Sequence, residues 1–542
     1  MTFVEDFDLD YGVDDILWDI VAIDDGDAGT AKDDRFIAVG ESYTDGTYLK
    51  QAIIIRVKAD LSDYDWIVPV GGLGNDVAYA VEQRANDNGN ILVVGKRYSQ
   101  IYSFGPSDNL WFAEYDTDGD LVGERLYGGS GNEEGFDIKE DVNTDPIQYV
   151  ITGGTGRYQD GDFDYFDDPG EPEISNSGEY WLFTIYPTGH ANEYDIIWQN
   201  IYDGGNNIGP TRDWSHSIVI DDDGDYVIAG LCRSCSTATG QMQAMLVKVE
   251  NDGTLDWKED FGDETTDGND RDQMAYNVIQ TNISTNAYLA SGISHPALDV
   301  CATENHDTYT LRVSNTGSNI WSANCTELAE GKGFGGLSNE DGFGAVLTCG
   351  GKYLIAGTAH SPSGDGDVTC NHDINGPNYT SDAWLLCLNS SGVKQWDFSI
   401  GGSKNDAAYS IIKSPDGSYL IAGEKGVGSE ADFFIYQFTL DECSKNQQGH
   451  EGTKSEFLHA YPNPSDDIVN ISFQCPATFT QSATITIINS LGTVVYCLKT
   501  KIENGVLEKK LVVHNFPAGL YSIRIVSSDK SYESKIAIER SY

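Results

Sequence analysis

A short apolar segment that ends in glycine occurs seven times in this sequence, and this repeat constrains the fold more strongly than any other feature. The segments end at Gly40, Gly95, Gly153, Gly230, Gly292, Gly357 and Gly423. The intervals between them run from 55 to 77 residues and average about 64. A repeat of this length predicts one supersecondary unit per copy, and neighbouring copies bury their apolar faces against each other.

Within a unit, apolar residues alternate with polar ones over four short stretches, and no helical period is found. In the second unit these stretches are residues 77–83, 90–95, 110–116 and 121–127, separated by turn sequences such as "NDNG" and "DTDGD". Four short strands per unit, repeated radially, are typical of a β-propeller. We therefore predict an all-β protein with a seven-bladed β-propeller over residues 1–440.

The two ends of this region complement each other. The seventh unit has only three strand-like stretches, whereas residues 3–8 align with residues 257–262, with Phe3 at the position of Trp257. We predict that residues 3–8 pair with the strand near residues 433–440. This pairing closes the ring and covers a sheet edge that would otherwise be exposed.

A glycine followed four positions later by tryptophan marks the last strand of several units. The glycine permits the positive φ of a tight hairpin turn, and the tryptophan begins the outer strand, where its ring can wedge against the next blade. We assign a structural role to Trp66, Trp257, Trp321, Trp396 and Phe3.

The chain carries 86 acidic and 33 basic residues, a net charge of −53, and nearly all of this excess lies before residue 441. Such a surface repels nucleic acid and anionic lipid. No stretch is apolar enough for a membrane helix, and "MTFVEDFDLD" carries no signal peptide. Ten cysteines, an even number, favour disulfides in an oxidising compartment. The C-x-x-C at Cys232 and Cys235 lacks both a second pair at zinc-site spacing and a surrounding βαβ pattern.

Acidic segments raise the question of calcium. The turns at residues 116–120 and 221–225 lack the glycine and the final acid of an EF-hand loop, so hairpin turns explain them better. The insertion at residues 158–173 offers hard oxygen ligands, and calcium is the one cofactor we consider, against a merely solvated insertion. The candidate ligands are Asp160, Asp162, Asp164, Asp167 and Asp168.

The repeat units resemble the Gly/Asp-rich propeller repeats of secreted proteins from Bacteroidetes-type bacteria, most closely at residues 361–396 and 401–424. This resemblance implies a scaffold and says little about function. No H-E-x-x-H, G-x-S-x-G or P-loop motif occurs, and the nine histidines are dispersed. A catalytic role is therefore less favoured than a binding role.

After a polar linker at residues 441–456, residues 457–542 alternate in a way that predicts a small Ig-like β-sandwich. Particular residues in this segment resemble the type A C-terminal sorting domain of type IX secretion substrates: Tyr461, Pro462, Asn463, Pro464, Gly492, Pro517, Gly519, Tyr521 and Lys535. The resemblance implies recognition by the secretion machinery, both translocon and shuttle. It also implies export to the surface or the surroundings of a Gram-negative Bacteroidetes-type cell.

Three hypotheses for function follow. The first is binding or adhesion, to a glycan or a surface protein, through insertions on one face of the propeller. The second is a glycoside hydrolase or lyase whose carboxylates, from separate blades, meet at the central channel. The third is a structural component of a surface coat. No nucleic-acid partner is expected.

Overall fold

The structure is a computed structural model of the whole chain. It describes residues 2–9, 13–23, 35–43, 49–72, 74–85, 89–99, 107–129, 131–156, 178–188, 194–202, 213–233, 235, 242–262, 272–282, 287–295, 305–321, 331–361, 366–368, 380–401, 404–427, 431–440, 457–461, 468–474, 481–489, 494–502, 506–513, 516, 518–527 and 530–538. Over these residues the regular elements are all β-strands. No helix in them is long and apolar enough to cross a membrane.

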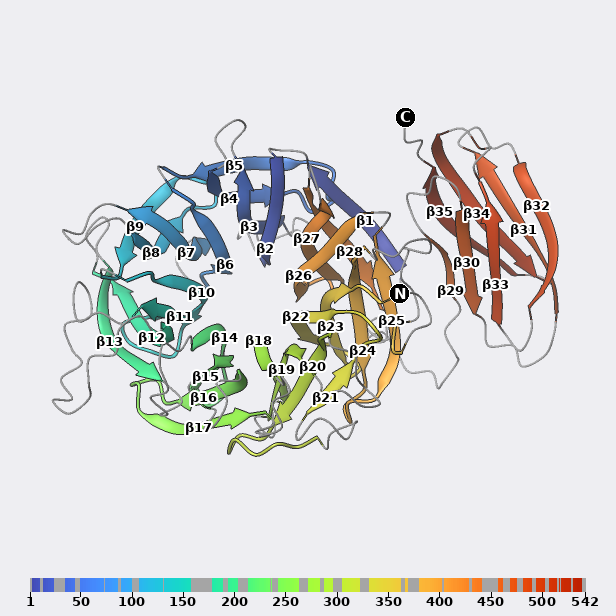
Figure 1. The fold of residues 1–542 in the computed structure, drawn as a ribbon. Helices are drawn as coiled ribbons and strands as arrows, with labels where there is room; N and C mark the ends of the chain where they lie inside the picture. Colours follow the sequence, from blue (N-terminus) through green and yellow to red (C-terminus); the bar gives the residue numbers. More distant parts are fainter. Residues whose placement is uncertain are drawn as a thin grey trace. The chain divides into compact units, whose positions relative to one another are not determined.

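Seven four-stranded antiparallel sheets are arranged as the blades of a ring, which confirms the seven-bladed propeller (Figure 1). Blade 1 contains β2 (Val13–Ile23), β3 (Arg35–Tyr43), β4 (Lys50–Val57) and β5 (Tyr64–Val70). Blade 2 contains β6 (Val77–Gln83), β7 (Ile91–Ser99), β8 (Ser107–Tyr115) and β9 (Leu121–Tyr127). Blade 3 contains β10 (Glu134–Asp141), β11 (Gln148–Gly156), β12 (Gly178–Pro187) and β13 (Tyr194–Tyr202).

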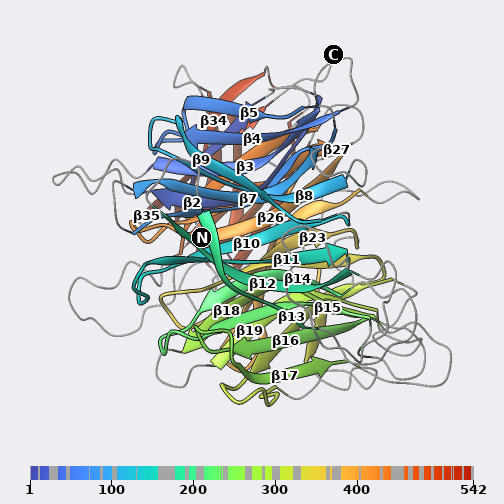
Figure 2. The same ribbon diagram turned by 90° about the vertical axis from the view of Figure 1, so that its left-hand side faces the viewer.

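The remaining blades follow the same order. Blade 4 contains β14 (Trp214–Ile220), β15 (Tyr226–Cys232), β16 (Gln243–Val249) and β17 (Leu255–Phe261). Blade 5 contains β18 (Gln273–Asn282), β19 (Ala287–Ser294), β20 (Asp307–Val313) and the short β21 (Lys332–Phe334). Blade 6 contains β22 (Glu340–Leu347), β23 (Tyr353–Ala359), β24 (Asp382–Leu388) and β25 (Lys394–Ile400). Figure 2 shows from the side how the sheets of successive blades follow one another.

Blade 7 is assembled from both ends of this region. Strands β26 (Asn405–Lys413), β27 (Tyr419–Val427) and β28 (Asp432–Thr439) come from the end, and β1 (Thr2–Leu9) is the fourth strand, next to β28. This arrangement confirms the predicted ring closure. It also covers the edge of β28, which would otherwise expose unpaired backbone groups.

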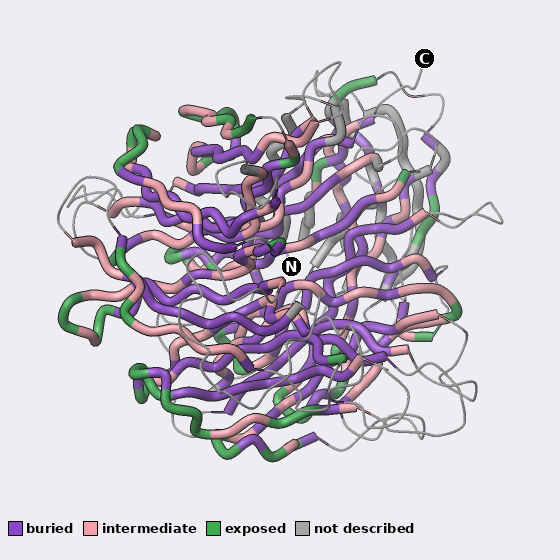
Figure 3. The backbone as a smooth tube through the Cα atoms, turned by 60° about the vertical axis from the view of Figure 1, so that its left-hand side comes forward, coloured by how far each residue is buried: buried purple, intermediate pink, exposed green. Residues whose placement is uncertain are grey.

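The propeller core lies between neighbouring sheets. The two middle strands of a blade are packed on both faces, and every residue of β15, β16, β23 and β24 is buried. Figure 3 shows the same pattern, with buried segments along the strands and exposed segments at turns. The runs of Val, Ile, Leu and Ala that define the sequence repeat are therefore inter-blade core. One shared cluster, for example, includes Val39 and Ile54 of blade 1 and Val93 and Trp111 of blade 2.

The C-terminal region folds into two antiparallel sheets. The first contains β29 (Phe457–Tyr461), β30 (Ile468–Gln474) and β33 (Val506–Val512). The second contains β31 (Gln481–Asn489), β32 (Val494–Ile502), β34 (Gly519–Ser527) and β35 (Lys530–Ile538). Buried side chains from both sheets, such as Ile471, Phe473, Ile487 and Ile523, form one hydrophobic core. The assignment of this domain to the Ig-like class stays a prediction.

Candidate functional site

The innermost strand of every blade contains a β-bulge, and the extra residue at the bulge always carries an aromatic ring. These residues are Trp18, Tyr79, Phe136, His216, Tyr276, Phe343 and Tyr409. A bulge removes one residue from the alternation of the strand and re-aims its side chain. The strands that carry these residues are the ones nearest the centre of the ring (Figure 1). The bulges thus bring one ring from each blade to the axis.

The seven repeat glycines pair with these bulges. Each glycine lies opposite the residue that precedes the aromatic one, as Gly40 lies opposite Leu17 and Gly357 opposite Gly342. A Cβ atom on any of the seven would lie only 1.7 to 2.0 Å from a backbone carbonyl oxygen of the bulged strand. The repeat glycines are therefore required because the bulge presses the neighbouring backbone against them.

The seven rings form a closed circle, which we name the axial girdle. Neighbouring centroids are 4.5 Å apart for Tyr409 and Trp18, 6.0 Å for Trp18 and Tyr79, and between 4.9 and 5.4 Å for the other five pairs. These distances are typical of interacting aromatic pairs. All seven side chains are only half-buried, so they keep contact with water at the axis.

We name the face of the ring at which the seven inner strands begin the start face. Above blades 1 to 3, Lys50 Nζ lies 2.7 Å from Glu41 Oε1, and Lys96 Nζ lies 3.0 Å from Glu134 Oε1. The girdle hydroxyl of Tyr79 donates to Glu134 Oε2 at 3.2 Å. Lys96 is 18% exposed and Glu134 13%, so solvent reaches this ion pair.

Blades 5, 6 and 7 together place a second polar group on the start face, in which His306 precedes β20 of blade 5. His306 Nδ1 lies 2.8 Å from Asp341 Oδ1, and Thr358 donates to the other oxygen of that carboxylate at 2.9 Å. Burial disfavours the charged imidazole, but the hydrogen bond and charge of Asp341 outweigh it and raise the pKa of His306. The girdle hydroxyl of Tyr409 donates to Glu424 at 2.5 Å. Acceptors and donors thus stand directly above the aromatic rings.

Blades 4 and 5 present an apolar sector between these polar groups. Leu231, Met274 and Ile293 form a small cluster against which Trp214 and Met242 pack. The Trp214 ring lies 5.7 Å from the girdle ring of Phe136. The start face therefore combines an aromatic surface with separate charged and apolar sectors.

On the other side of the girdle, polar groups connect the inner strands to one another. Asp19 accepts the backbone N–H of Val81 in blade 2 at 3.0 Å and the hydroxyl of Ser410 in blade 7 at 2.8 Å. Asp137 accepts the N–H of Ile218 in blade 4 at 2.9 Å and pairs with Lys139 at 2.9 Å. Burial raises the pKa of Asp19 to about 6. These contacts hold neighbouring blades in register.

A carboxylate also precedes most girdle residues by three positions. These buried acids are Asp15, Asp76, Glu133, Asp213, Glu340 and Asp406, and blade 5 has Gln273 instead. Asp76, for example, accepts the N–H groups of Gly72 at 2.8 Å and Tyr98 at 3.0 Å. Some of the many acidic residues are thus buried, and they accept backbone hydrogen bonds where the chain enters a blade.

Glu340 faces a second buried acid, Asp307 of β20. Burial, reinforced by the charge of Glu340, raises the pKa of Asp307 to about 8. Burial also raises the pKa of Glu340 to about 7, although Gly336, Ser361 and His360 donate backbone hydrogen bonds to it. Because both side chains are at least 93% buried, this pair cannot meet a substrate.

The predicted calcium ligands Asp160, Asp162, Asp164, Asp167 and Asp168 lie outside the described residues. Within the described part of the chain, no three His, Cys, Asp or Glu side chains are placed to hold a metal ion. The turns at residues 116–120 and 221–225 join paired strands. In each, the first aspartate accepts backbone N–H groups, as Asp116 does from Asp118 and Asp120.

Three of the four predicted structural tryptophans contact a hairpin turn of the next blade. The indole N–H of Trp66 donates to Thr117 O at 3.2 Å, and that of Trp257 donates to Asn315 O at 2.8 Å, both in the hairpin turn of the next blade. Trp321 lies against the turn glycine Gly392 in the same way. Trp396 lies in β25, the outer strand of blade 6, and the backbone of Phe3 lies in β1. Trp198 makes the same contact, with Asn251 O at 3.0 Å, and the sequence analysis missed it.

The residues of the predicted sorting signal are only partly described. Tyr461 ends β29, Gly519 begins β34, and Tyr521 is buried in the core of the two C-terminal sheets, 5.6 Å from the ring of Phe516. Lys535 is exposed on β35 and pairs with Ser522. Pro462, Asn463, Pro464, Gly492 and Pro517 lie outside the described residues.

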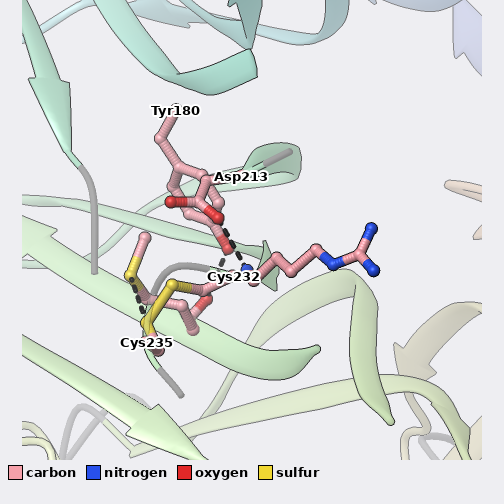
Figure 4. Close-up of a disulfide and its surroundings, with 6 residues drawn as sticks. Tyr180, Asp213, Cys232 and Cys235 are labelled. Carbon is pink, nitrogen blue, oxygen red and sulfur yellow. Dashed lines mark hydrogen bonds between the residues drawn. A yellow bond between two sulfur atoms is a disulfide. The ribbon is translucent and has the colours of Figure 1, made fainter. Parts of the chain in front are cut away.

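Among the residues that the structure describes, one disulfide is present, between Cys232 and Cys235 (Figure 4). It agrees with the general expectation of disulfides, which named no pairing. Cys235 Sγ lies 3.7 Å from Met245 Sδ, and Asp213 accepts the N–H of Arg233 at 2.6 Å. Both sulfurs belong to buried residues in the core between blades 3 and 4. The disulfide therefore fixes the segment that leaves β15.

An open depression of about 470 Å³ lies between the outer strand of blade 4 and a hairpin turn of blade 5, lined by Glu259, Asp260, Phe261 and residues 317–321. It lies at the periphery, away from the girdle. Its lining comes from one strand and one hairpin turn, whereas every blade contributes a ring to the girdle. We therefore take the start face of the girdle as the candidate site.

A comparison with known families assigns the end of the chain. Residues 459–539 match the model of the secretion system C-terminal sorting domain. The chain is a propeller protein with a type IX sorting domain. This finding confirms the resemblance seen in the sequence and implies export to the cell surface or beyond. It also implies an interaction of the tail with the type IX secretion machinery, and an origin in the Bacteroidetes.

No curated protein sequence matches the chain. Among solved structures, Sqt1 from Chaetomium thermophilum is similar at 8% identity and a TM-score of 0.40, over 81% of this chain and 100% of that one. A PL25 ulvan lyase bound to its saccharide is similar at 12% identity and a TM-score of 0.38, over 86% and 94%. The propeller domain of the Trilobed protease from Pyrococcus furiosus is similar at 9% identity and a TM-score of 0.38, over 81% and 100%. These values are too low to support an argument about function.

Proposed function

We propose that this protein is a secreted or cell-surface binding protein that holds a glycan or a surface protein at the start face of its propeller. The observation that supports this role is the axial girdle. All seven blades contribute a ring to it, and ionisable side chains from at least four blades stand above it. Binding sites commonly combine aromatic surface with a few placed polar groups.

The positions of the long insertions in the strand order also support a binding site on the start face. The two longest connections of the propeller, residues 157–177 and 360–381, join second to third strands in blades 3 and 6. Because the strands are antiparallel, these connections leave and re-enter their blades at the start face. Calcium binding by Asp160, Asp162, Asp164, Asp167 and Asp168 is part of this proposal, as a means of ordering the first insertion.

A second candidate, a glycoside hydrolase or lyase, draws support from the carboxylates of Glu134 and Asp341. They come from blades 3 and 6 and stand on the start face with partners that can exchange protons, the Tyr79 hydroxyl and the His306 imidazole. The binding role is favoured because both carboxylates are already ion-paired. The third hypothesis, a structural component of a surface coat, is less favoured because it does not explain the aromatic rings at the axis.

The test is binding of the labelled full-length protein to intact bacterial cells and to glycan-coated surfaces, with calcium and with a chelator. We expect saturable binding that falls at least tenfold in the Trp214→Ala variant, while the peripheral Tyr64→Ala variant, altered at an exposed outer-strand residue, binds normally. Trp214→Phe controls for packing. Binding that is equal in all four proteins would contradict the proposal, and new reducing ends in the mixture would favour the enzyme.

A further inference from the structure

We infer that the start face of the axial girdle binds an uncharged saccharide; this inference rests on the proposed binding function and specifies its ligand. The girdle and the side chains above it match the chemistry of a neutral sugar in three respects. They offer acceptors beside donors, apolar surface near both, and basic groups that are each paired with a carboxylate.

The first respect is hydrogen bonding. A sugar hydroxyl donates one hydrogen bond and accepts others, so it is satisfied only where both kinds of partner are close. The start face supplies acceptors in Glu134, Asp341 and Glu424. It supplies donors in Lys50, Lys96 and the His306 imidazole. Side-chain exposed fractions of 27% for Lys50 and 17% for Asp341 show that solvent, and hence a ligand group, reaches both kinds.

The second respect is apolar surface. The C–H faces of a sugar ring pack on aromatic and aliphatic side chains, whose burial supplies the driving force. The girdle rings lie below the polar groups, and Trp214 and Met274 extend the apolar surface above blades 4 and 5. A purely apolar ligand would cover Glu134 and Lys96 without replacing the hydrogen bonds that water makes to them, which disfavours such a ligand.

The third respect is charge. Each basic group named above is paired with a carboxylate: Lys50 with Glu41, Lys96 with Glu134, and His306 with Asp341. An anionic saccharide would therefore find no uncompensated cation among these side chains, and the net charge of −53 would repel it. A cationic ligand could use the aromatic rings, but the carboxylates of Glu134 and Asp341 are already ion-paired. Neutral chemistry is favoured over both.

The experiment is titration calorimetry of the full-length protein with three probes: neutral hexasaccharides of glucose, mannose and galactose; an oligogalacturonate; and choline. We expect a neutral hexasaccharide to bind with an affinity that changes less than about twofold between 0.05 and 0.5 M salt, since no ion pair forms. Lys96→Met is expected to weaken it about tenfold, whereas the matched Lys58→Met, in an exposed pair with Asp63 on a hairpin turn, leaves it unchanged.

The outcomes separate this inference from the proposed function. Tighter binding of the oligogalacturonate or of choline overturns the inference. So does neutral-sugar binding that Lys96→Met and Trp214→Ala leave intact while both variants keep the wild-type melting temperature. Binding of cells or of a surface protein, without any binding of the hexasaccharides, overturns the inference and leaves the proposed function standing. Absence of binding in every assay contradicts both.

Discussion

At the scale of single residues, the girdle contains one exception, His216, at a position where the other blades have Trp, Tyr or Phe. The His216 ring contacts the rings of Phe136 and Tyr276, with centroids 4.9 and 5.1 Å away. Its Nε2 is buried and has no hydrogen-bond partner among the described residues. Burial lowers the pKa of His216 to about 4. A neutral imidazole thus stands where the other six blades have the ring of Trp, Tyr or Phe.

Replacing His216 by Phe should increase stability in acid. The unfolded chain takes up the proton near pH 6.5 and the folded protein only near pH 4, so the wild type loses stability as the pH falls through this window, by up to about 3 kcal/mol. We expect His216→Phe to unfold at a higher temperature than the wild type at pH 4.5, with a smaller difference at pH 7.5. Parallel pH profiles of the two melting temperatures would show that His216 does not titrate in this way.

The repeat glycines offer a second test at this scale. Gly357→Ala would place a Cβ atom 1.7 Å from the backbone oxygen of Asp341, so the bulge must shift, and we expect a loss of about 3 kcal/mol or more. Gly72 has nothing within 4 Å of such an atom, and Gly72→Ala should change the free energy of unfolding by less than about 1 kcal/mol. Denaturant unfolding of both variants measures the difference. Equal costs would mean that the bulge is not what requires glycine.

At the scale of elements, the sequence predicted the strands well and the bulges not at all. The apolar runs ending in glycine are middle strands buried on both faces, so their pattern is strong. The girdle residue varies among Trp, Tyr, Phe and His, and it precedes the repeat glycine by 14 to 22 residues, so no fixed spacing marks it. The usable signal was the acid three residues before it, in six of the seven blades.

The inter-blade tryptophans give a prediction about elements. Trp257→Phe removes the indole hydrogen bond to Asn315 and part of the contact with the turn of blade 5, and we expect a cost of about 1 to 2 kcal/mol. Trp396→Phe is the matched control. The next blade has no hairpin between its third and fourth strands, because β1 and β28 come from opposite ends of the propeller sequence. Thermal unfolding should rank Trp257→Phe as clearly less stable, and the reverse ranking would refute the role in blade contacts.

At the scale of the whole molecule, the stability of the propeller depends on β1, because this strand closes the ring as the fourth strand of blade 7. Deletion of residues 1–9 exposes the edge of β28, so we expect a lower melting temperature and association that increases with protein concentration. A synthetic peptide of residues 2–9 added in trans should reverse both effects, and a scrambled peptide should not. A deletion variant that stays monomeric with an unchanged melting temperature would contradict this.

The propeller and the sorting domain were predictable from the sequence. The propeller appears as a repeated strand pattern, and the sorting domain as short motifs in a fixed order. The site was not predictable, because it is made by seven residues from seven distant segments that meet only when the ring closes. The sequence pattern predicted that function lies in the long insertions, whereas the structure indicates a site at the inner strands.

The most direct test of the central claim, that the axial girdle is the floor of the binding site, is an X-ray structure of the full chain with the tightest-binding hexasaccharide. We predict ligand density on the start face, within about 4 Å of at least two girdle rings and of Lys96 or Trp214. Ligand density confined to the outer strands, or to the depression beside Trp321, would contradict the claim.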